Sequence, residues 1–352
     1  MKKASLILLC IILFCSVMCL FSCDKPINDN DDVWFRYQLT NDETGYYIEY
    51  CNVSDRTLEE NSSVDVVIPS EYKGKPVVGI TNQAFTNSEI IKSVTLPDTI
   101  TRIDAGAFVN CTGLESIHIT KNVKLVVGSS FSNCTSLKEI TVDSENEYFT
   151  SADGNLYTAD GKKLLLYTPG KTESEFSIPE GVVSVGKHTF QKCESLKSIT
   201  LPSTVTDMPF DAIVICDNLE EILVDEGNGT YKSIDGNLYT KDGKTLLSIC
   251  SGKTTVVIPE GVTAIARYAA YCCNNLASVT VAGSVNFIGE GAFTHCDNLA
   301  EITFVETTGW SAIPQWGKFQ TTKEIDKSEL ESPTEAMALI LEYSNCEWQR
   351  EE

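Results

Sequence analysis

A short pattern of apolar and polar positions recurs along most of this chain. In GAFVNCTGLESIHIT, residues 106–120, the apolar positions are Phe108, Cys111, Leu114, Ile117 and Ile119. The alternation over the last residues predicts a short, half-buried β-strand, while AFVNC has room for only a turn or one helical coil. Nearly the same pattern returns at 129–142 as SSFSNCTSLKEITV.

Seven copies of the pattern share one template, in which an apolar residue stands three places before a cysteine or serine. These apolar residues are Phe85, Phe108, Phe131, Phe190, Ile213, Ala270 and Phe293. Ser88 follows the first, and cysteines separated by 23, 59, 23, 57 and 23 residues follow the others: Cys111, Cys134, Cys193, Cys216, Cys273 and Cys296. Because so short a unit cannot bury its own apolar side, we expect the copies to stack as coils of a solenoid with a continuous parallel sheet.

The unit AFxxCxxLxxIxLP resembles the leucine-rich repeats of the BspA-like family, which are bacterial surface proteins. The resemblance rests on AFVNCTGLESIHI from Ala107, AFTHCDNLAEITF from Ala292, LPDTITRI from Leu96 and LPSTVTDM from Leu201. It covers residues 64–305, and the AF pair is lost at Ala212-Ile213 and Ala269-Ala270. The resemblance implies an α/β fold, a strand-rich leucine-rich-repeat solenoid with a concave parallel sheet and short turns or helices opposite.

Two related segments interrupt the spacing of the repeats. SADGNLYTADGKKLLLYTPG at 151–170 and SIDGNLYTKDGKTLLSICSG at 233–252 carry Asp160-Gly161 and Asp242-Gly243 between strand-like runs. This turn pair favours a tight β-hairpin, so we predict hairpin insertions near 144–178 and 226–258. Their tyrosines are expected to be exposed and to offer further contacts: Tyr157, Tyr167 and Tyr239. A catalytic lid is the alternative, but a lid needs a site beneath it.

The open ends of a solenoid expose its core and need caps. Residues 33–63 contain VWFRYQL and GYYIEYC, which alternate like strands and are predicted to seal the front. In the C-terminal cap, 306–352, Ser332, Pro333 and Glu335 predict an N-cap, a first-turn proline and a capping-box glutamate before the helical segment AMALILEY. Three apolar side chains of that helix would close the last coil: Leu339, Ile340 and Tyr343.

The first 22 residues have the pattern of an export signal. Lys2 and Lys3 precede an apolar run, and Leu20-Phe21-Ser22-Cys23 resembles a bacterial lipobox. That resemblance implies cleavage before Cys23 and its acylation, which would hold the protein at a bilayer. A plain secretory signal and a retained transmembrane helix are the alternatives. The stretch DKPINDNDD that follows predicts a solvated tether within 23–63, and it lacks the glycine and distal glutamate of a calcium loop.

Charge narrows the range of partners. The chain has 49 acidic and 27 basic residues, a formal net charge of −22, and loss of the signal with its two lysines brings it to −24. Such a charge repels nucleic acid and anionic lipid head groups, so nucleic acid is excluded as a partner and attachment to a membrane requires the lipid. We expect a lipid-anchored protein of the bacterial cell envelope that faces the outer surface.

The cysteine positions predict free thiols. Ten of the 14 cysteines lie beyond Cys23, and six of them occupy one inward position of successive coils. Parallel side-chain directions in such a column disfavour the torsion of a disulfide, and cysteine packs well as a small apolar residue. Cys51, Cys272 and Cys346 lie outside the column, and their state is left open.

Groups that could carry out catalysis do not gather in the sequence. The repeat spacing scatters the histidines His118, His188 and His295 over different coils and faces, which predicts neither a metal site nor a nucleophile with its base. Three glutamates share one outward strand position, but other coils separate them: Glu139, Glu221 and Glu301. We therefore expect no enzyme and no cofactor; an envelope glycan hydrolase is the weaker alternative.

The outward positions of the predicted sheet form a polar face, and this face is the predicted binding surface. It consists of Ser93, Thr95, Ser116, His118, Glu139, Thr141, Ser198, Thr200, Glu221, Leu223, Ser278, Thr280, Glu301 and Thr303. Exposed parallel strands carry such ladders without any ligand, and no aromatic anchor marks this one. The family resemblance implies adhesion to a host matrix protein or to a microbial surface protein or glycan. A structural or assembly role facing the periplasm is the alternative.

Overall fold

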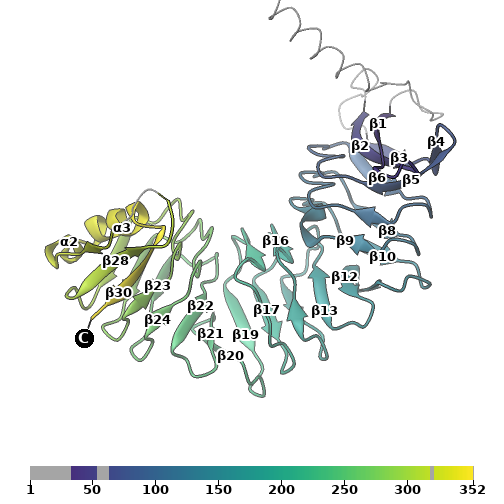
Figure 1. The fold of residues 1–352 in the computed structure, drawn as a ribbon. Helices are drawn as coiled ribbons and strands as arrows, with labels where there is room; N and C mark the ends of the chain where they lie inside the picture. The colour runs from purple at the N-terminus through teal and green to yellow at the C-terminus, as the bar shows by residue number, and fades with distance from the viewer. Residues whose placement is uncertain (1–32, 54–62, 318–320, 352) are drawn as a thin grey trace, which may run out of the picture.

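The chain winds into an arc of successive coils (Figure 1). The computed structural model describes residues 33–53, 63–317 and 321–351, so the predicted signal, Cys23 and the acidic tether lie outside the described residues. Strands dominate these ranges, and the helices in them are η1 (Gly128–Phe131, a 3₁₀ turn), α2 (Ser328–Glu331) and α3 (Pro333–Glu342). The predicted strand-rich solenoid is confirmed, with about 10 turns. None of the described helices is long and apolar enough to cross a membrane.

The longer strands of the coils run parallel in three consecutive sheets of the described chain. The first sheet contains β3 (Val64–Val67), β6 (Ile91–Thr95), β8 (Ser116–Ile119) and β10 (Glu139–Val142). The second contains β14 (Glu175–Ser177), β17 (Ser198–Leu201) and β19 (Glu221–Val224), and the third β23 (Thr255–Val257), β25 (Ser278–Val281) and β27 (Glu301–Phe304). Neighbouring strands pair at the same repeat position, as Ser93 does with Ser116. A slip of one residue would turn the apolar side chains to solvent, so the repeat pattern itself fixes the register.

The remaining sides of each coil are a second row of very short strands and a row of AFxxC turns. The short strands are β7 (Arg102–Ile103), β9 (Leu125–Val126), β15 (Ser184–Val185), β24 (Ala264–Ile265) and β26 (Phe287–Ile288). In the turn row, β16 (Phe190–Gln191) pairs with β18 (Ile213–Val214). The family resemblance implied a long-strand sheet on the concave side, but Figure 1 shows β16 of the turn row at the inner edge of the arc, so there the turns face the concavity.

The apolar positions of the repeat form a continuous column in the interior. Phe108 is fully buried between Phe85 and Phe131, with ring centroids 4.8 Å and 5.4 Å away. The Phe108 and Phe131 rings are inclined by only 4°. Each ring therefore covers the ring of the preceding coil, as the stacking of identical units requires.

The cysteine column does more than fill space. The Cys111 thiol donates a hydrogen bond to the carbonyl oxygen of Phe85 at 2.8 Å, and the Cys134 thiol does so to Phe108 at 3.1 Å. The same bond recurs from Cys216 to Phe190. These three thiols thus satisfy buried carbonyls of the preceding coil, a role that the hydroxyl of serine can also fill, whereas the Cys193 thiol contacts the nearby Gln191 carbonyl at 3.8 Å. All ten described cysteines are free, which confirms the predicted free thiols of the column.

Thiol reactivity should follow this burial. Desolvation raises the pKa of the Cys111 and Cys296 thiols from 9.0 to about 12, whereas Cys272 is only partly buried. Because the thiolate is the reactive form, iodoacetamide at pH 8 should modify Cys272 first and the column only after unfolding. Peptide mass spectrometry with and without urea measures this order. Rapid labelling of Cys111 in the folded protein would contradict it.

The same shift gives a pH dependence. Since the folded thiols have the raised pKa, their protonated form contributes stability that is complete below pH 9 and is lost as the pH rises toward about 12. Urea midpoints measured from pH 8 to pH 11 should therefore fall. Replacing Cys111 by serine should make the fall shallower, because a serine hydroxyl does not titrate in this range.

The two inserted segments are three-stranded antiparallel units. They are formed by β11 (Phe149–Ala152), β12 (Asn155–Thr158) and β13 (Lys163–Leu166), and by β20 (Tyr231–Ile234), β21 (Asn237–Thr240) and β22 (Thr245–Ser248). The tight turns are Asp153-Gly154 and Asp235-Gly236, whose residues all have positive φ, as a two-residue type I′ turn requires. The predicted pair Asp160-Gly161 lies instead in the longer loop between β12 and β13, where the Asp160 carboxylate accepts bonds from Thr158 and Lys162.

These units are buried layers of the solenoid, so the expected exposure of their tyrosines was wrong. Tyr157, Tyr167 and Tyr239 are only 4%, 2% and 1% exposed. The amide of Tyr167 bonds to the carbonyl of Thr189, and its ring lies 5.6 Å from that of Phe190, so Tyr167 replaces the missing phenylalanine of the turn row. The amide of Ile140 bonds to Gly154 at 2.8 Å, which joins the unit to the long-strand sheet.

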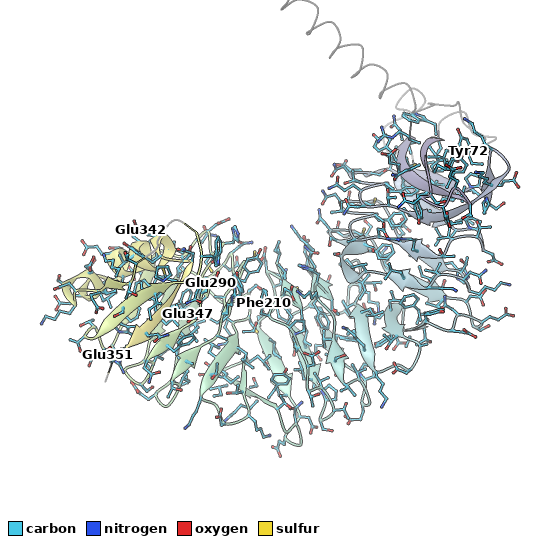
Figure 2. The ribbon with its side chains drawn as sticks, viewed as in Figure 1. Tyr72, Phe210, Glu290, Glu342, Glu347 and Glu351 are labelled. Carbon is cyan, nitrogen blue, oxygen red and sulfur yellow. The ribbon has the colours of Figure 1, made fainter. Side chains whose placement is uncertain are left out.

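The N-terminal cap packs against the first coil and includes strands beyond the expected range 33–63. It consists of β1 (Val33–Leu39), β2 (Tyr46–Val53), β4 (Glu71–Tyr72) and β5 (Lys75–Ile80). Strand β2 pairs in parallel with β5 and so continues the row of short strands. The Tyr37 ring stacks on Tyr72 at 3.9 Å near the end of the arc (Figure 2). Phe35 reaches the core column at Phe85, 6.3 Å away.

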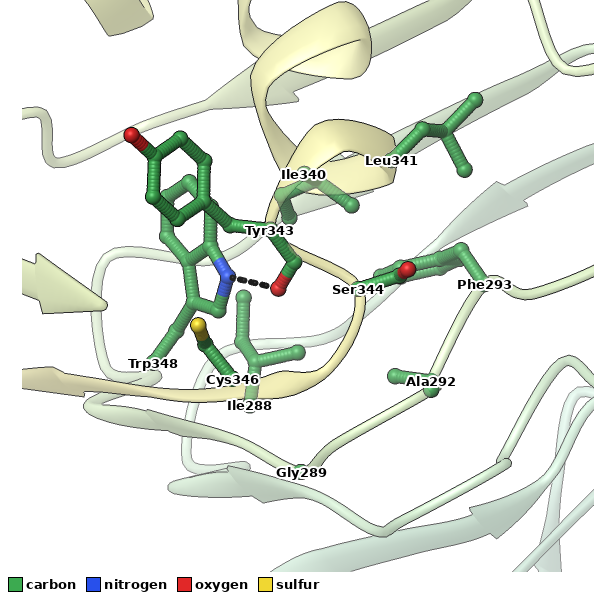
Figure 3. A pocket seen from close by; sticks show the side chains of 11 residues that line it. Ile288, Gly289, Ala292, Phe293, Ile340, Leu341, Tyr343, Ser344, Cys346 and Trp348 are labelled. Atoms are coloured by element: carbon green, nitrogen blue, oxygen red, sulfur yellow. Dashed lines mark hydrogen bonds between the residues drawn. The ribbon is translucent and has the colours of Figure 1, made fainter. Parts of the chain in front are cut away.

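The C-terminal cap combines the predicted helix with a sheet that the sequence did not predict. The sheet contains β28 (Trp310–Pro314), β29 (Lys323–Glu324) and β30 (Cys346–Arg350), and β30 pairs with the last short strand, β26. Helix α3 begins at Pro333 as predicted, but the Ser332 side chain caps no backbone amide, so the predicted capping box does not form. Figure 3 shows α3 and Trp348 packed on the last coil, where a gap of only about 10 Å³ remains.

Candidate binding site

The predicted polar face lies along the long-strand sheets, and most of its side chains are at least partly exposed. Ser198 is the exception, because it is only 8% exposed. Four of these side chains form hydrogen bonds to neighbouring coils: Ser93, His118, Thr141 and Ser278. The ring of His118 bonds to the Thr141 hydroxyl at 2.9 Å, and the Ser93 hydroxyl donates to Asp65. These bonds join neighbouring coils on the polar face.

The strand pairing adds residues to this face that the repeat pattern did not predict. Asp65 pairs with Ser93, Glu175 with Ser198, and Thr255 with Ser278. The repeat was aligned on AFxxC, and these residues precede the first turn or follow an inserted unit. Their register could be found only from the stacking of the strands.

A second surface was not predicted from the sequence. It is a hollow of about 480 Å³ on the turn side of the C-terminal coils, and we call it the turn-side hollow. Phe210 and Glu290, two of its residues, lie in the C-terminal half of the arc (Figure 2). Its volume is in the range of small-molecule sites, about 300–1,000 Å³.

Aromatic rings from successive coils line this hollow. Phe210 stacks on Tyr268 at 4.6 Å, Tyr268 contacts Tyr271 at 5.7 Å, and Tyr271 contacts His295 at 5.5 Å. Phe210 is 44% exposed, and Trp316, which lines the same hollow, is 62% exposed. Exposed aromatic side chains that gather in one place are typical of binding sites.

The charged groups of the hollow are paired. Glu290 is 2% exposed, and its carboxylate contacts the Arg267 guanidinium at 2.5 Å and accepts a hydrogen bond from the indole N–H of Trp316. The Arg267 guanidinium also lies over the Tyr268 ring, 5.1 Å from its centroid. The hydrogen bond with Tyr268, followed by the attraction of Glu290, raises the pKa of Arg267 above its ordinary value, so this cation persists at every physiological pH.

Asp211 and His188 complete the lining. The Asp211 carboxylate is held by Lys187 at 3.4 Å through Oδ2, while its buried Oδ1 has no hydrogen-bond partner among the described residues. The Nδ1 atom of His188 is likewise without a partner there. A buried polar atom without a bond costs about 1–3 kcal/mol, so a donor that entered beside Asp211 would be stabilised.

The positions of two histidines differ from the prediction. The sequence spacing placed His188 and His295 on different faces, yet both line the turn-side hollow, because their turns stack along the same side of the solenoid. His118 lies apart, on the polar face. The described residues contain no group of three or more histidine, cysteine or acidic side chains that could hold a metal ion.

A signal for the hollow was present in the repeat alignment. At the two positions before the AF pair, the first coil carries the uncharged polar residues Asn82-Gln83, and the next two coils carry small residues, Ala105-Gly106 and Gly128-Ser129. The C-terminal coils carry at least one charged residue at the same positions: Lys187-His188, Phe210-Asp211, Arg267-Tyr268 and Glu290-Gly291. Because these positions neighbour one another in stacked coils, the departures from the template gather on one surface.

Backbone strain accompanies these departures. The residue before each column position has positive φ, and in the first coils it is asparagine, which tolerates this conformation. The side-chain amide of Asn110 also donates a hydrogen bond to the side-chain oxygen of Asn87 at 2.7 Å. The side-chain amide of Asn133 donates in the same way to Asn110 at 2.8 Å. Ile215 occupies the equivalent position with φ 56°, which strains a β-branched residue.

Replacing Ile215 with asparagine should therefore stabilise the protein, by about 1 kcal/mol, because the left-handed conformation becomes less costly. Urea unfolding followed by circular dichroism measures the change. The reverse substitution Asn110→Ile is the matched control and should destabilise by at least as much, since it also breaks the asparagine ladder. An unchanged or lower urea midpoint for Ile215→Asn would contradict the claim that the backbone at Ile215 is strained.

The parallel coils, the AFxxC turns and the constant register define a leucine-rich-repeat solenoid. Residues 52–153, 170–249 and 243–334 match the family described as BspA type leucine rich repeat region, in 6 copies. The chain therefore belongs to the BspA-type leucine-rich-repeat family. No curated protein matches the chain.

Solved structures of bacterial repeat proteins are similar to this chain. A leucine rich cell surface protein from Faecalibacterium prausnitzii A2-165 is 20% identical, with a TM-score of 0.39, over 82% of this chain and 97% of that one. A leucine-rich repeat protein from Eubacterium ventriosum is 19% identical, with a TM-score of 0.41, over 82% and 96%. The pneumococcal vaccine antigen PcpA is 18% identical, with a TM-score of 0.39, over 80% and 70%.

Proposed function

We propose that this chain is a non-enzymatic binding protein of the bacterial cell envelope, attached through a lipid on Cys23 and adhesin-like in its action. Its partner is a protein or glycan on a host or on another microbe. The observation that carries the proposal is the turn-side hollow, where exposed Phe210 and Trp316 lie beside paired charges on a repeat scaffold. Membership of a repeat family that includes bacterial surface proteins supports it.

The two surfaces have different parts in this proposal. The hollow provides aromatic contact area, which is the main source of affinity in small binding sites. On the polar face, His118 bonds to Thr141 and Ser93 to Asp65 across coils, and no exposed aromatic ring of the described residues marks this surface. It therefore adds contacts of low affinity along the length of the solenoid.

A pull-down tests the binding function. The full chain, immobilised through a C-terminal tag, is exposed to purified host matrix proteins and to whole bacteria of other species. We expect at least one partner to be retained, and the Phe210→Ala variant to retain less of it. Retention of no partner by the wild-type chain would overturn the proposal.

Location is tested on intact cells. Trypsin added to living cells should remove the protein, together with a known surface marker. If the marker is cut and the protein is not, it faces the periplasm and has a structural or assembly role. Replacing Cys23 with alanine should release the protein from the membrane fraction, because the lipid is its proposed anchor.

A further inference from the structure

We infer that the turn-side hollow binds an uncharged pyranose ring of a glycan. The inference rests on the proposed binding function and names the ligand class of its main site. A pyranose has an apolar face of C–H groups and a rim of hydroxyl groups. Such a ligand needs aromatic rings to cover its face and polar groups at the edge of those rings to bond its hydroxyls.

The hollow presents both kinds of group at suitable positions. The Phe210 ring stacks on Tyr268 at 4.6 Å and is still 44% exposed, so part of it remains open to a ligand. Trp316, 62% exposed, lines the same hollow and is positioned by its indole bond to Glu290. Two aromatic side chains held by contacts within the fold form a platform that loses little conformational entropy on binding.

The charge balance of the hollow favours an uncharged ligand over a cation. Each carboxylate has a basic partner, Glu290 with Arg267 and Asp211 with Lys187. The Arg267 guanidinium already lies over the Tyr268 ring, at 5.1 Å from the centroid. An aromatic cage for a quaternary ammonium group would instead leave its rings free for the ligand cation.

Unpaired polar atoms point to a ligand rich in hydroxyl groups. Asp211 is 7% exposed, and its Oδ1 atom has no hydrogen-bond partner among the described residues. His188, which also lines the hollow, has an unpartnered Nδ1. A hydroxyl group can donate to the carboxylate or accept from the imidazole, whereas an apolar peptide segment would leave both atoms unpaired.

Isothermal titration calorimetry of the full chain tests the inference, in a detergent without a sugar head group. The probes are cellotriose, maltotriose and the trimer of N-acetylglucosamine, with choline as the cationic probe. At least one trisaccharide should bind and change the tryptophan fluorescence, and choline should not bind. Phe210→Ala should weaken trisaccharide binding about tenfold, through the loss of one stacking surface.

Tyr148→Ala is the matched control, because Tyr148 is 42% exposed and lines a different hollow. It should bind the trisaccharide as the wild type does, and Trp316→Ala should repeat the loss seen for Phe210→Ala. Three results would overturn the inference: no trisaccharide binds at millimolar concentration, choline binds in their place, or Phe210→Ala binds as tightly as the wild type.

These failures are distinct from failure of the proposed function. A protein partner that is still retained by Phe210→Ala, and is not displaced by any trisaccharide, would leave the binding function standing and overturn only the glycan site. If the wild-type chain retained no partner in the pull-down, both the proposed binding function and the glycan site would be overturned.

Discussion

Replacing Phe108 with alanine is expected to destabilise the N-terminal coils by about 3–5 kcal/mol. The ring is fully buried, and it is stacked between Phe85 at 4.8 Å and Phe131 at 5.4 Å. Truncation would leave a cavity that neither neighbour can fill, because both rings are fixed by their own coils. The loss includes the aromatic contacts as well as the buried area.

Urea unfolding and hydrogen exchange measure this loss. In a solenoid each coil contacts only its neighbours, so exchange should accelerate most in the coils around Phe108 and least in the C-terminal cap. Phe210→Ala is the matched control, because that ring is 44% exposed, and it should change stability far less. Equal destabilisation by the two variants would contradict the claim that the stacked position of Phe108 in the core stabilises the coils.

The second large effect is expected at Asn228, which is fully buried at the start of an inserted unit. Its side-chain amide donates to the carbonyls of Pro202 at 2.8 Å and Val205 at 2.9 Å. Its side-chain oxygen accepts hydrogen bonds from the backbone amides of Thr230 at 2.9 Å and Tyr231 at 2.8 Å. Alanine would remove four bonds and leave backbone groups unpaired in the interior, so we expect a loss of about 2–4 kcal/mol.

Two further variants serve as controls for the Asn228→Ala measurement. Asn218→Ala removes one bond, to the Glu194 carbonyl at 2.7 Å, from an exposed side chain, and should change the free energy of unfolding by less than about 0.5 kcal/mol. Asn146→Ala should match Asn228→Ala, because Asn146 makes the same set of bonds in the other unit. A small effect at both buried asparagines would show that the units are held by other contacts.

Much of the interior was predictable because it is a local pattern repeated. The Phe108 and Cys111 positions recur every 23 residues within a run of coils, and stacking identical coils places identical positions in contact. The same repetition predicted the polar face, while the start of α3 at Pro333 was predicted from a local signal, a proline in the first helical turn. It did not reveal the carbonyl bonds of the thiols, which depend on the spacing between coils.

The inserted units show where this logic stops. Asp160-Gly161 and Asp153-Gly154 are both turn pairs in the sequence, and only strand pairing shows that the second forms the tight turn. Tyr157 belongs to a run that a surface hairpin could expose. It is buried because its side chain belongs to a core cluster that includes Ile178 and Val185 of the following coil.

The sequence by itself determined the coil, its period, its register and the columns of its core, because each depends on residues within one repeat and its copies. The tertiary structure decided which side of the coils faces inward, and it brought Phe210, Tyr268 and Trp316 together around one hollow. That gathering depends on the curvature of the arc and on the position of the C-terminal cap. Both arise from packing between distant segments, which no single repeat encodes.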